Sequence, residues 1–265
     1  MLQRLFPLVG FRWATRILAF IFLFLLSIAN VLIRTRLTPH DRARRGEKGI
    51  VATNLQKDIW PDIRIFRHSV FAVTTAGVFF IEWALFIPIS YISTYALYHE
   101  VNTTFSYQIL AILNVGSFFG RWAPGYVADR FGRYNAMIAT VALCLVSVLC
   151  LWLTCTPDDG PGGLAQLVIF VLVFGFASGS NISLTPVCVG QLCGTEVFGR
   201  WYASLYTVVS FGCLTGIPIA GQLIASDGGR YTALIAFCGG CYGLGLICFV
   251  WARVMAVGWG VKKIY

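Results

Sequence analysis

The sequence places several charged side chains between two apolar runs. In the stretch GRWAPGYVADRFGR, which begins at Gly120, the charged residues Arg121, Asp129, Arg130 and Arg133 fall within thirteen positions. A guanidinium group can bind a carboxylate or a phosphate through two parallel hydrogen bonds. A carboxylate can pair with such a group or with the exposed N–H groups at the start of a helix. These residue types therefore indicate anion binding and ion pairing.

The composition decides the environment in which these charges act. The chain has 265 residues, of which 58% are hydrophobic and 12% charged, and its mean hydropathy is +0.76. A soluble domain usually carries about 25% charged residues. We therefore expect an integral membrane protein whose main partner is the lipid bilayer. The net charge of +9 fits basic residues in cytoplasmic loops better than nucleic-acid binding, and no nucleic-acid partner is expected.

Long apolar segments predict the elements that hold the charged stretch. A helix needs about 20 mainly apolar residues to cross the hydrocarbon layer. The runs are too long, and alternate too little, for the strands of a barrel. The expected fold is therefore an all-α membrane protein with seven transmembrane helices. They are expected at 13–33, 69–96, 106–128, 134–154, 164–190, 202–225 and 232–257.

The basic residues orient these helices. Successive connectors between membrane helices lie on opposite sides of the membrane. Of the 20 Lys and Arg, fifteen fall in the segments on one side and four in those on the other, and Arg121 lies inside a helix. Lys and Arg favour the cytoplasmic side, so we expect a cytoplasmic C-terminus. The plasma membrane is expected rather than an internal membrane. The expected organisation is an outer segment with the first helix at 1–33, a basic cytoplasmic loop at 34–68, a six-helix bundle at 69–258 and a cytoplasmic tail at 259–265.

Three polar residues lie inside the predicted helices. Arg121 precedes Asp129 by eight residues, which places it roughly 12 Å into the membrane. A charge at that depth is costly, so Arg121 either extends towards the interface or faces a wet path where it binds an anion. Asn114 lies further back on the same segment. Glu82 is a compensating carboxylate, a proton carrier, or a residue at an interface or against a neighbouring helix.

Small and sulfur-containing residues in other spans favour packing over chemistry. The segment FGFASGSNISLTPV is expected to pack closely against another helix, with cavity lining by Asn181 and Ser183 as the alternative. Cys238 and Cys241 have CxxC spacing but lie in an apolar run without a nearby histidine, and are expected to act as small hydrophobic residues. We expect no metal and no cofactor. The sequence has no phosphate-binding loop, HExxH or GxSxG motif, so an enzyme is not expected.

The loop between the third and fourth predicted helices carries a motif. It reads Gly125-x-x-x-Asp129-Arg130-x-Gly132-Arg133 and resembles the GxxxDRxGR loop of the major facilitator superfamily of transporters. Gly125 is expected to let helices approach closely, and Gly132 to permit a tight turn. The resemblance implies that Asp129, Arg130 and Arg133 form a cytoplasmic latch between two halves. The alternative is a positively charged turn that only fixes the topology.

The resemblance also covers the order of the helices. The six predicted helices after the basic loop are similar to helices seven to twelve of the family, and the first is similar to helix six. The stretch from 116 to 138 looks most like the fungal branch of the monocarboxylate porters. That likeness implies a carboxylate bound by Arg121, with Asn114 and Glu82 as further substrate-binding residues and a proton as candidate co-substrate. The family often has an aspartate where Ser117 stands.

Two functions follow from the resemblance. The first is a secondary transporter of small organic anions that works by alternating access and is present here as a truncated half, with a missing N-terminal half as its partner. The second is a membrane protein that does not transport and instead has an interaction or regulatory role. The sequence does not name the substrate, the coupling ion or the direction of transport.

Overall fold

The chain divides into two units, which are described separately. A computed structural model describes residues 2–32, 63–157, 160–194 and 197–258, and the units are Met1–Lys57 and Asp58–Tyr265. Of the predicted basic loop at 34–68, residues 34–62 lie outside the described residues, as does the predicted tail at 259–265. In the first unit, α1 (Leu2–Leu32) is interrupted at Gly10, whose φ of 75° and ψ of 160° are not helical. The 23 residues Gly10–Leu32 are long and apolar enough to cross a membrane.

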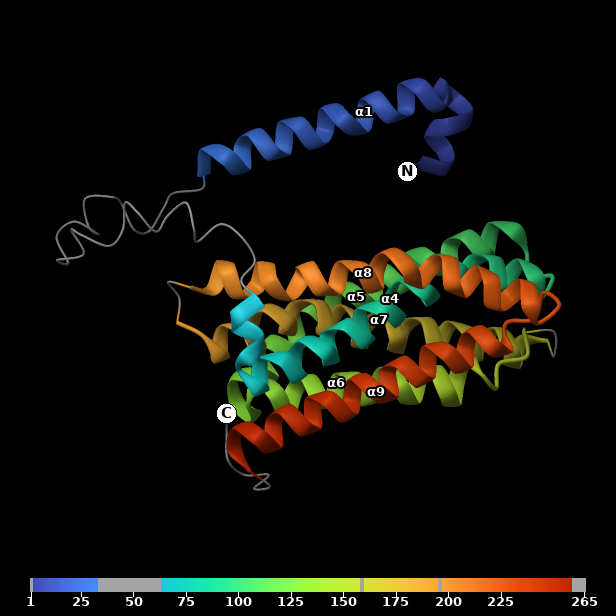
Figure 1. Cartoon of the computed structure of the whole chain (residues 1–265). Helices are drawn as coiled ribbons and strands as arrows, with labels where there is room; N and C mark the ends of the chain where they lie inside the picture. Colours follow the sequence, from blue (N-terminus) through green and yellow to red (C-terminus); the bar gives the residue numbers. More distant parts are fainter. Residues whose placement is uncertain (1, 33–62, 158–159, 195–196, 259–265) are drawn as a thin grey trace. The chain divides into compact units, whose positions relative to one another are not determined.

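The second unit is a bundle of six long helices (Figure 1). Its described residues form helices and no strands, which confirms the predicted all-α class. The 29-residue α5 carries more polar and charged residues than its neighbours and falls outside the six segments whose length and hydropathy suit a membrane span. The elements are η1 (Ile63–Arg67), α4 (Ser69–Tyr98), α5 (Thr103–Phe131), α6 (Arg133–Val146), η2 (Ser147–Trp152), α7 (Pro161–Leu192), α8 (Phe198–Ser226) and α9 (Thr232–Val257).

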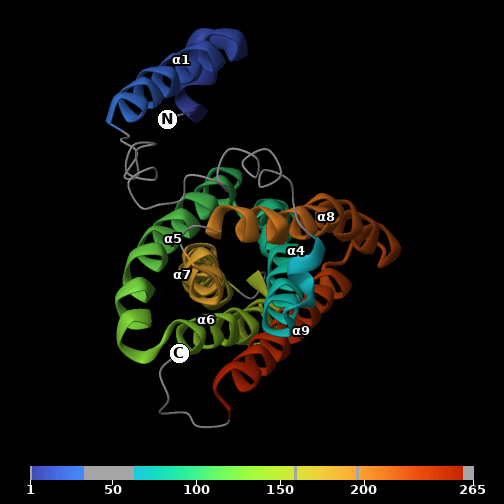
Figure 2. The same ribbon diagram turned by 60° about the vertical axis from the view of Figure 1, so that its left-hand side comes forward.

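The six helices pack as two groups of three (Figure 2). In one group α7 lies between α5 and α6, and in the other α4 lies against α8 and α9. Contacts between α6 and α9 join the groups. Large aromatic side chains fill the core: Trp152 stacks on Phe170 with ring centroids 5.1 Å apart, and Phe174 meets the edge of Tyr242 at 6.1 Å. Such rings remove a large apolar area from water or lipid contact and fix helix separation.

Glycines let α5 and α7 approach closely. On α5, a methyl group at Gly116 would lie 2.5 Å from the carbonyl oxygen of Leu172, and one at Gly120 would overlap the carbonyl of Phe176. On α7, a methyl group at Gly179 would lie 2.6 Å from the carbonyl oxygen of Ser117. Small residues four apart are a recurrent means of close contact between membrane helices. The predicted close packing of the segment FGFASGSNISLTPV is therefore confirmed.

The corner between α5 and α6 is shorter than expected. The predicted helices at 106–128 and 134–154 leave a connector at 129–133, but α5 continues to Phe131 and α6 begins at Arg133. Gly132 alone turns the chain, with φ 93° and ψ 143°, so its predicted role in a tight turn is confirmed. The predicted close approach at Gly125 stays a prediction, because a methyl group there would meet no described atom within 4 Å. Among the described helices, the close approach lies about one and a half to two and a half turns earlier, at Gly120 and Gly116.

Candidate functional site

Arg121 lies in an open cavity along one side of α5. The cavity has a volume of about 540 Å³ and is lined by Asn114, Ser117, Phe118, Arg121 and Trp122. Positions three and four apart share a helix face, which brings Asn114, Ser117 and Arg121 together. Phe118 and Trp122 flank them with 70% and 78% of their surface exposed. The structure thus brings two predicted substrate-binding residues, Arg121 and Asn114, to one surface.

The guanidinium of Arg121 is available to a ligand. Within the described ranges it forms no hydrogen bond or ion pair, and its side chain is exposed. Asn114 donates its amide N–H to the carbonyl oxygen of Leu110 at 2.8 Å, and its amide oxygen accepts no hydrogen bond from the described residues. Ser117 stands where the porter family often has an aspartate and is 8% exposed. The cavity therefore offers one positive donor group and no described negative charge of its own.

Glu82 lies apart from this cavity. It sits near the middle of α4, is only 5% exposed, and is not among the residues that line the cavity around Arg121. No ion pair joins Glu82 to any basic side chain that the structure describes. Its electrostatic neighbours are Tyr206 and Cys213 on α8 and Tyr242 on α9. The expectation that Glu82 contacts the same substrate as Arg121 stays a prediction.

The charged motif occupies the end of α5 and the start of α6. Asp129 and Arg130 lie on the last turn of α5, both exposed. The guanidinium of Arg130 lies over the ring of Tyr126, 4.6 Å from its centroid. Arg133 is half-buried and lies within electrostatic range of Cys188 on α7. In the described chain neither arginine pairs with Asp129, so the carboxylate faces outward and is open to a partner.

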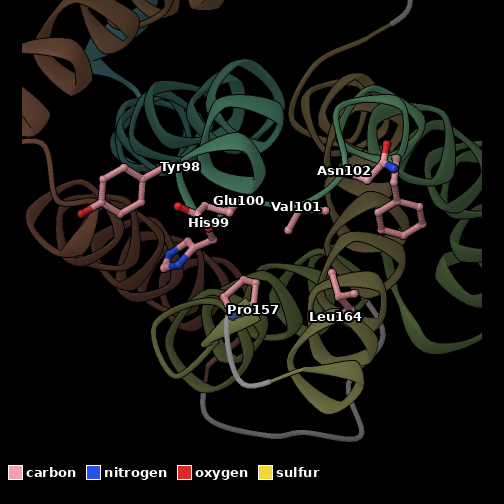
Figure 3. Close-up of a pocket in the computed structure, with 8 residues that line it drawn as sticks. Tyr98, His99, Glu100, Val101, Asn102, Pro157 and Leu164 are labelled. Atoms are coloured by element: carbon pink, nitrogen blue, oxygen red, sulfur yellow. The ribbon is translucent and has the colours of Figure 1, made fainter.

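A second open cavity lies at the other end of α5, where α4 and α5 meet. It has a volume of about 760 Å³, and Figure 3 shows Tyr98 and His99 on one side of it, Asn102 on the other, and Pro157 and Leu164 across from them. The imidazole of His99 packs against the rings of Tyr95 and Tyr98 at 4.7 and 5.1 Å.

The second cavity is shaped mainly by structural contacts. Asn102 caps α5 by accepting a hydrogen bond from the N–H of Thr104 at 2.9 Å. Glu100 has a φ of 54°, a conformation that glycine or asparagine usually adopts, and it ends the turn after α4. This cavity therefore has a polar wall, but no arginine or lysine is among the residues that line it.

Sequence reasoning missed the polar contacts inside the bundle. The amide oxygen of Asn181 accepts a hydrogen bond from the hydroxyl of Thr140 at 2.9 Å, and its amide N–H reaches the sulfur of Cys144 at 3.4 Å. The hydroxyls of Thr74 and Tyr134 lie 3.0 Å apart. Hydropathy gives the depth of such residues but not the side of the helix that they occupy. The GxxxG spacing of Gly116 and Gly120 was the sequence signal for the α5–α7 contact.

Comparison with known proteins identifies the family. The model of the Major Facilitator Superfamily matches residues 4–200 and 125–259. The MFS-type transporter opdF of Penicillium oxalicum is 36% identical over 98% of this chain and 57% of its own length. The riboflavin transporter MCH5 of Saccharomyces cerevisiae is 33% identical over 95% of this chain and 48% of its own length. The MFS transporter asaE of Aspergillus flavus is 35% identical over 100% of this chain and 55% of its own length.

These matches run along nearly the whole chain, and the chain spans about half the length of the curated relatives it matches. The relatives carry names of several kinds of transporter, so the likeness to monocarboxylate porters stays a prediction, as does the expected missing half. Six apolar helices, the Gly125–Arg133 motif at a one-residue corner and the family match all agree. The chain belongs to the major facilitator superfamily.

Proposed function

We propose that this chain serves secondary transport of small organic anions, with Arg121 as the group that binds the substrate carboxylate. The observation that carries the proposal is the guanidinium of Arg121, which is exposed in an open cavity along one side of α5 and pairs with no described residue. It lies ten residues from the helix end at Phe131, roughly 15 Å at 1.5 Å per residue. A positive charge at that depth calls for a polar path or an anionic partner, and a carboxylate matches its two-pronged donor geometry.

The surroundings of Arg121 suit a small anion with an apolar body. Phe118 and Trp122, four residues apart on α5, give an apolar wall beside the guanidinium, and Asn114 adds an acceptor. A monocarboxylate has this division between a charged head and an apolar tail. Riboflavin, named for the yeast relative, is a second candidate substrate because its flat ring can stack on an exposed indole such as Trp122.

The charged corner supports a gating role in the same proposal. Asp129 faces outward without a described partner, and Arg130 is held over Tyr126. We infer that Asp129 and Arg133 bind a second bundle in one state of the transport cycle and release it in the other, as alternating access requires. The membrane concerned is proposed to be the plasma membrane, with the corner on the cytoplasmic side.

Uptake by reconstituted protein tests the proposal. Vesicles that contain the protein are supplied with labelled lactate in one arm and labelled riboflavin in the other. Arg121→Lys keeps the charge but loses the two-pronged geometry, so lactate uptake is expected to fall at least tenfold, which corresponds to about 1.4 kcal/mol. Arg230→Lys is the matched control, because among the described residues Arg230 pairs only with Asp227 at the end of α8, and its side chain is 70% exposed.

The outcomes separate the candidates. Normal lactate uptake by Arg121→Lys at normal membrane abundance would exclude Arg121 as the binding group. Uptake of riboflavin but not lactate would replace the substrate class and keep the transport function. Absence of uptake of either probe by correctly inserted wild-type protein would favour a membrane protein with an interaction or regulatory role.

A further inference from the structure

The turn that ends α4 holds a glutamate where the backbone favours glycine. Glu100 has a φ of 54°, and its N–H donates to the carbonyl oxygen of Leu97 at 3.1 Å. The N–H of Val101 donates to the carbonyl oxygen of Ala96, also at 3.1 Å. These two hydrogen bonds make a common helix ending in which the left-handed residue is usually glycine, because a side chain there is strained. Glu100 therefore carries a backbone strain that glycine would not.

The strained residue lines the open cavity between α4 and α5. This cavity has a volume of about 760 Å³, and Glu100 is the one acidic or basic residue apart from His99 among the described residues that line it. Figure 3 shows Glu100 on the same side of the opening as Tyr98 and His99. At the turn between α8 and α9, Arg230 pairs with Asp227 at 3.1 Å, and neither residue lines the cavity. The exposed carboxylate of Glu100 thus gives the cavity a negative charge.

Aromatic rings form the wall beside that charge. The ring of Tyr98 is 52% exposed, and its centroid lies 5.1 Å from that of His99 and 5.5 Å from that of Tyr231. The buried ring of Tyr95 packs on the same two rings, at 4.7 Å from His99 and 5.3 Å from Tyr231. The hydroxyl of Tyr95 donates to the carbonyl oxygen of Cys155 at 2.9 Å. These contacts fix the exposed face of Tyr98 before any ligand binds.

A carboxylate beside an exposed aromatic ring suits a quaternary ammonium group. Such a cation is attracted to the face of a ring within about 6 Å of its centroid. Its methyl groups need apolar contacts rather than hydrogen bonds, and Phe105 and Leu164 in the cavity lining can supply them. A metal ion fits less well, because the described residues contain no group of three or more His, Cys, Asp or Glu side chains that could hold one.

We propose that the cavity between α4 and α5 binds a quaternary ammonium cation. The carboxylate of Glu100 supplies the opposite charge, and the ring of Tyr98 supplies the aromatic face. This site is separate from the cavity of Arg121, because Phe105 and Arg121 are about 16 residues apart on α5, or roughly 24 Å. The site therefore goes beyond the proposed transport of anions. Choline as a free solute and the choline headgroup of a phospholipid both carry the required group.

Equilibrium binding of labelled choline tests the site, with the full chain purified in phosphatidylglycerol nanodiscs. The wild type is expected to bind choline saturably. Glu100→Gln keeps the size of the side chain but removes its charge, so the Kd is expected to rise about tenfold or more. Tyr98→Leu removes the aromatic face and should raise the Kd about threefold or more. Asp227→Asn is the matched control and should bind as the wild type, because it makes the same change in net charge outside the cavity.

Glu100→Gly separates binding from folding. Glycine adopts the left-handed conformation without strain, so this variant is expected to unfold at a higher temperature than the wild type. It should nevertheless bind choline as weakly as Glu100→Gln. A lower unfolding temperature would show that the fold itself needs the Glu100 side chain, and would overturn the inference from backbone strain.

A neutral analogue of choline tests recognition of the charge. In this analogue a tert-butyl group replaces the trimethylammonium group, so the shape is kept, and it is expected not to displace labelled choline. Equal displacement by the analogue, or wild-type affinity in Glu100→Gln, would overturn the proposal. So would the absence of saturable choline binding by folded wild-type protein.

Nanodiscs of phosphatidylcholine distinguish the two sources of the cation. Weaker binding of labelled choline in these nanodiscs would identify the lipid headgroup as the occupant, whereas equal binding would identify the free solute. The binding assay involves no transport step. Its result is therefore independent of whether Arg121 binds a carboxylate, and the two proposals can fail separately.

Discussion

A methyl group at Gly120 is expected to push α5 and α7 apart. Its position would overlap the carbonyl of Phe176, a backbone group that cannot rotate away. Overpacking of this kind typically costs about 1–3 kcal/mol. The hydrogen bond from the Ser180 hydroxyl to the Gly120 carbonyl, 2.9 Å long, would stretch as well, at about 0.5–1.5 kcal/mol. Gly120→Ala should therefore destabilise the bundle by roughly 2–4 kcal/mol, taking both effects together.

Thermal unfolding followed with a thiol-reactive dye measures this effect. The thiols of Cys144, Cys188 and Cys238 are fully buried and become reactive only when the bundle opens. At about 2–4 °C per kcal/mol for a chain of this size, the midpoint is expected to fall by roughly 4–16 °C. Gly125→Ala is the matched control, because the same added methyl group has open space around it.

Both variants replace a glycine inside α5, and alanine is the better helix former by up to about 1 kcal/mol. That gain is common to both, so the difference between the two midpoints isolates the collision with α7. Gly125→Ala should equal or exceed the wild-type midpoint. If Gly120→Ala unfolds at the wild-type temperature, or if both variants fall by the same amount, the close contact at Gly120 does not contribute as inferred.

Two further stability changes follow from the polar contacts. Asn181→Ala removes the acceptor of the Thr140 hydroxyl and the donor to Cys144 and should cost about 1–3 kcal/mol; the dye assay checks it, and an unchanged midpoint would contradict it. Asn102→Ala removes the side chain that caps α5 by accepting a hydrogen bond from the N–H of Thr104. The free energy of unfolding should therefore fall by about 1 kcal/mol, which the dye assay detects as a lower midpoint. Asn102→Ser should retain most of the cap.

The helix positions could be predicted from the sequence because hydropathy reports depth directly. The expected segments at 69–96 and 232–257 differ by at most two residues at either end from α4 (Ser69–Tyr98) and α9 (Thr232–Val257). The prediction of the corner between α5 and α6 was less accurate, because it assigned the charged residues to a loop. In the structure Asp129 and Arg130 continue α5, since a charged side chain at a membrane surface can extend outward from a helix without breaking it.

The direction in which each polar side chain points could not be predicted. Hydropathy places Arg121 and Glu82 inside predicted membrane helices, but it does not show whether the two side chains face each other. In the structure Arg121 lies in an open cavity and Glu82 in the interior. Apolar residues lie on all sides of helix α4, so its sequence does not show which side meets α8 and α9. Only packing with those two helices decides that.

The single-residue corner at Gly132 has a mechanical consequence. Because Asp129 and Arg130 are part of α5 rather than of a loop, a partner that binds them applies its force to the helix itself. Only Gly132 separates α5 from α6, so no flexible loop absorbs that force before it reaches α6. The α7 contact at Gly116 and Gly120 then resists sliding of α5. Binding at the charged end should consequently tilt α5, α6 and α7 together and carry the Arg121 cavity with them.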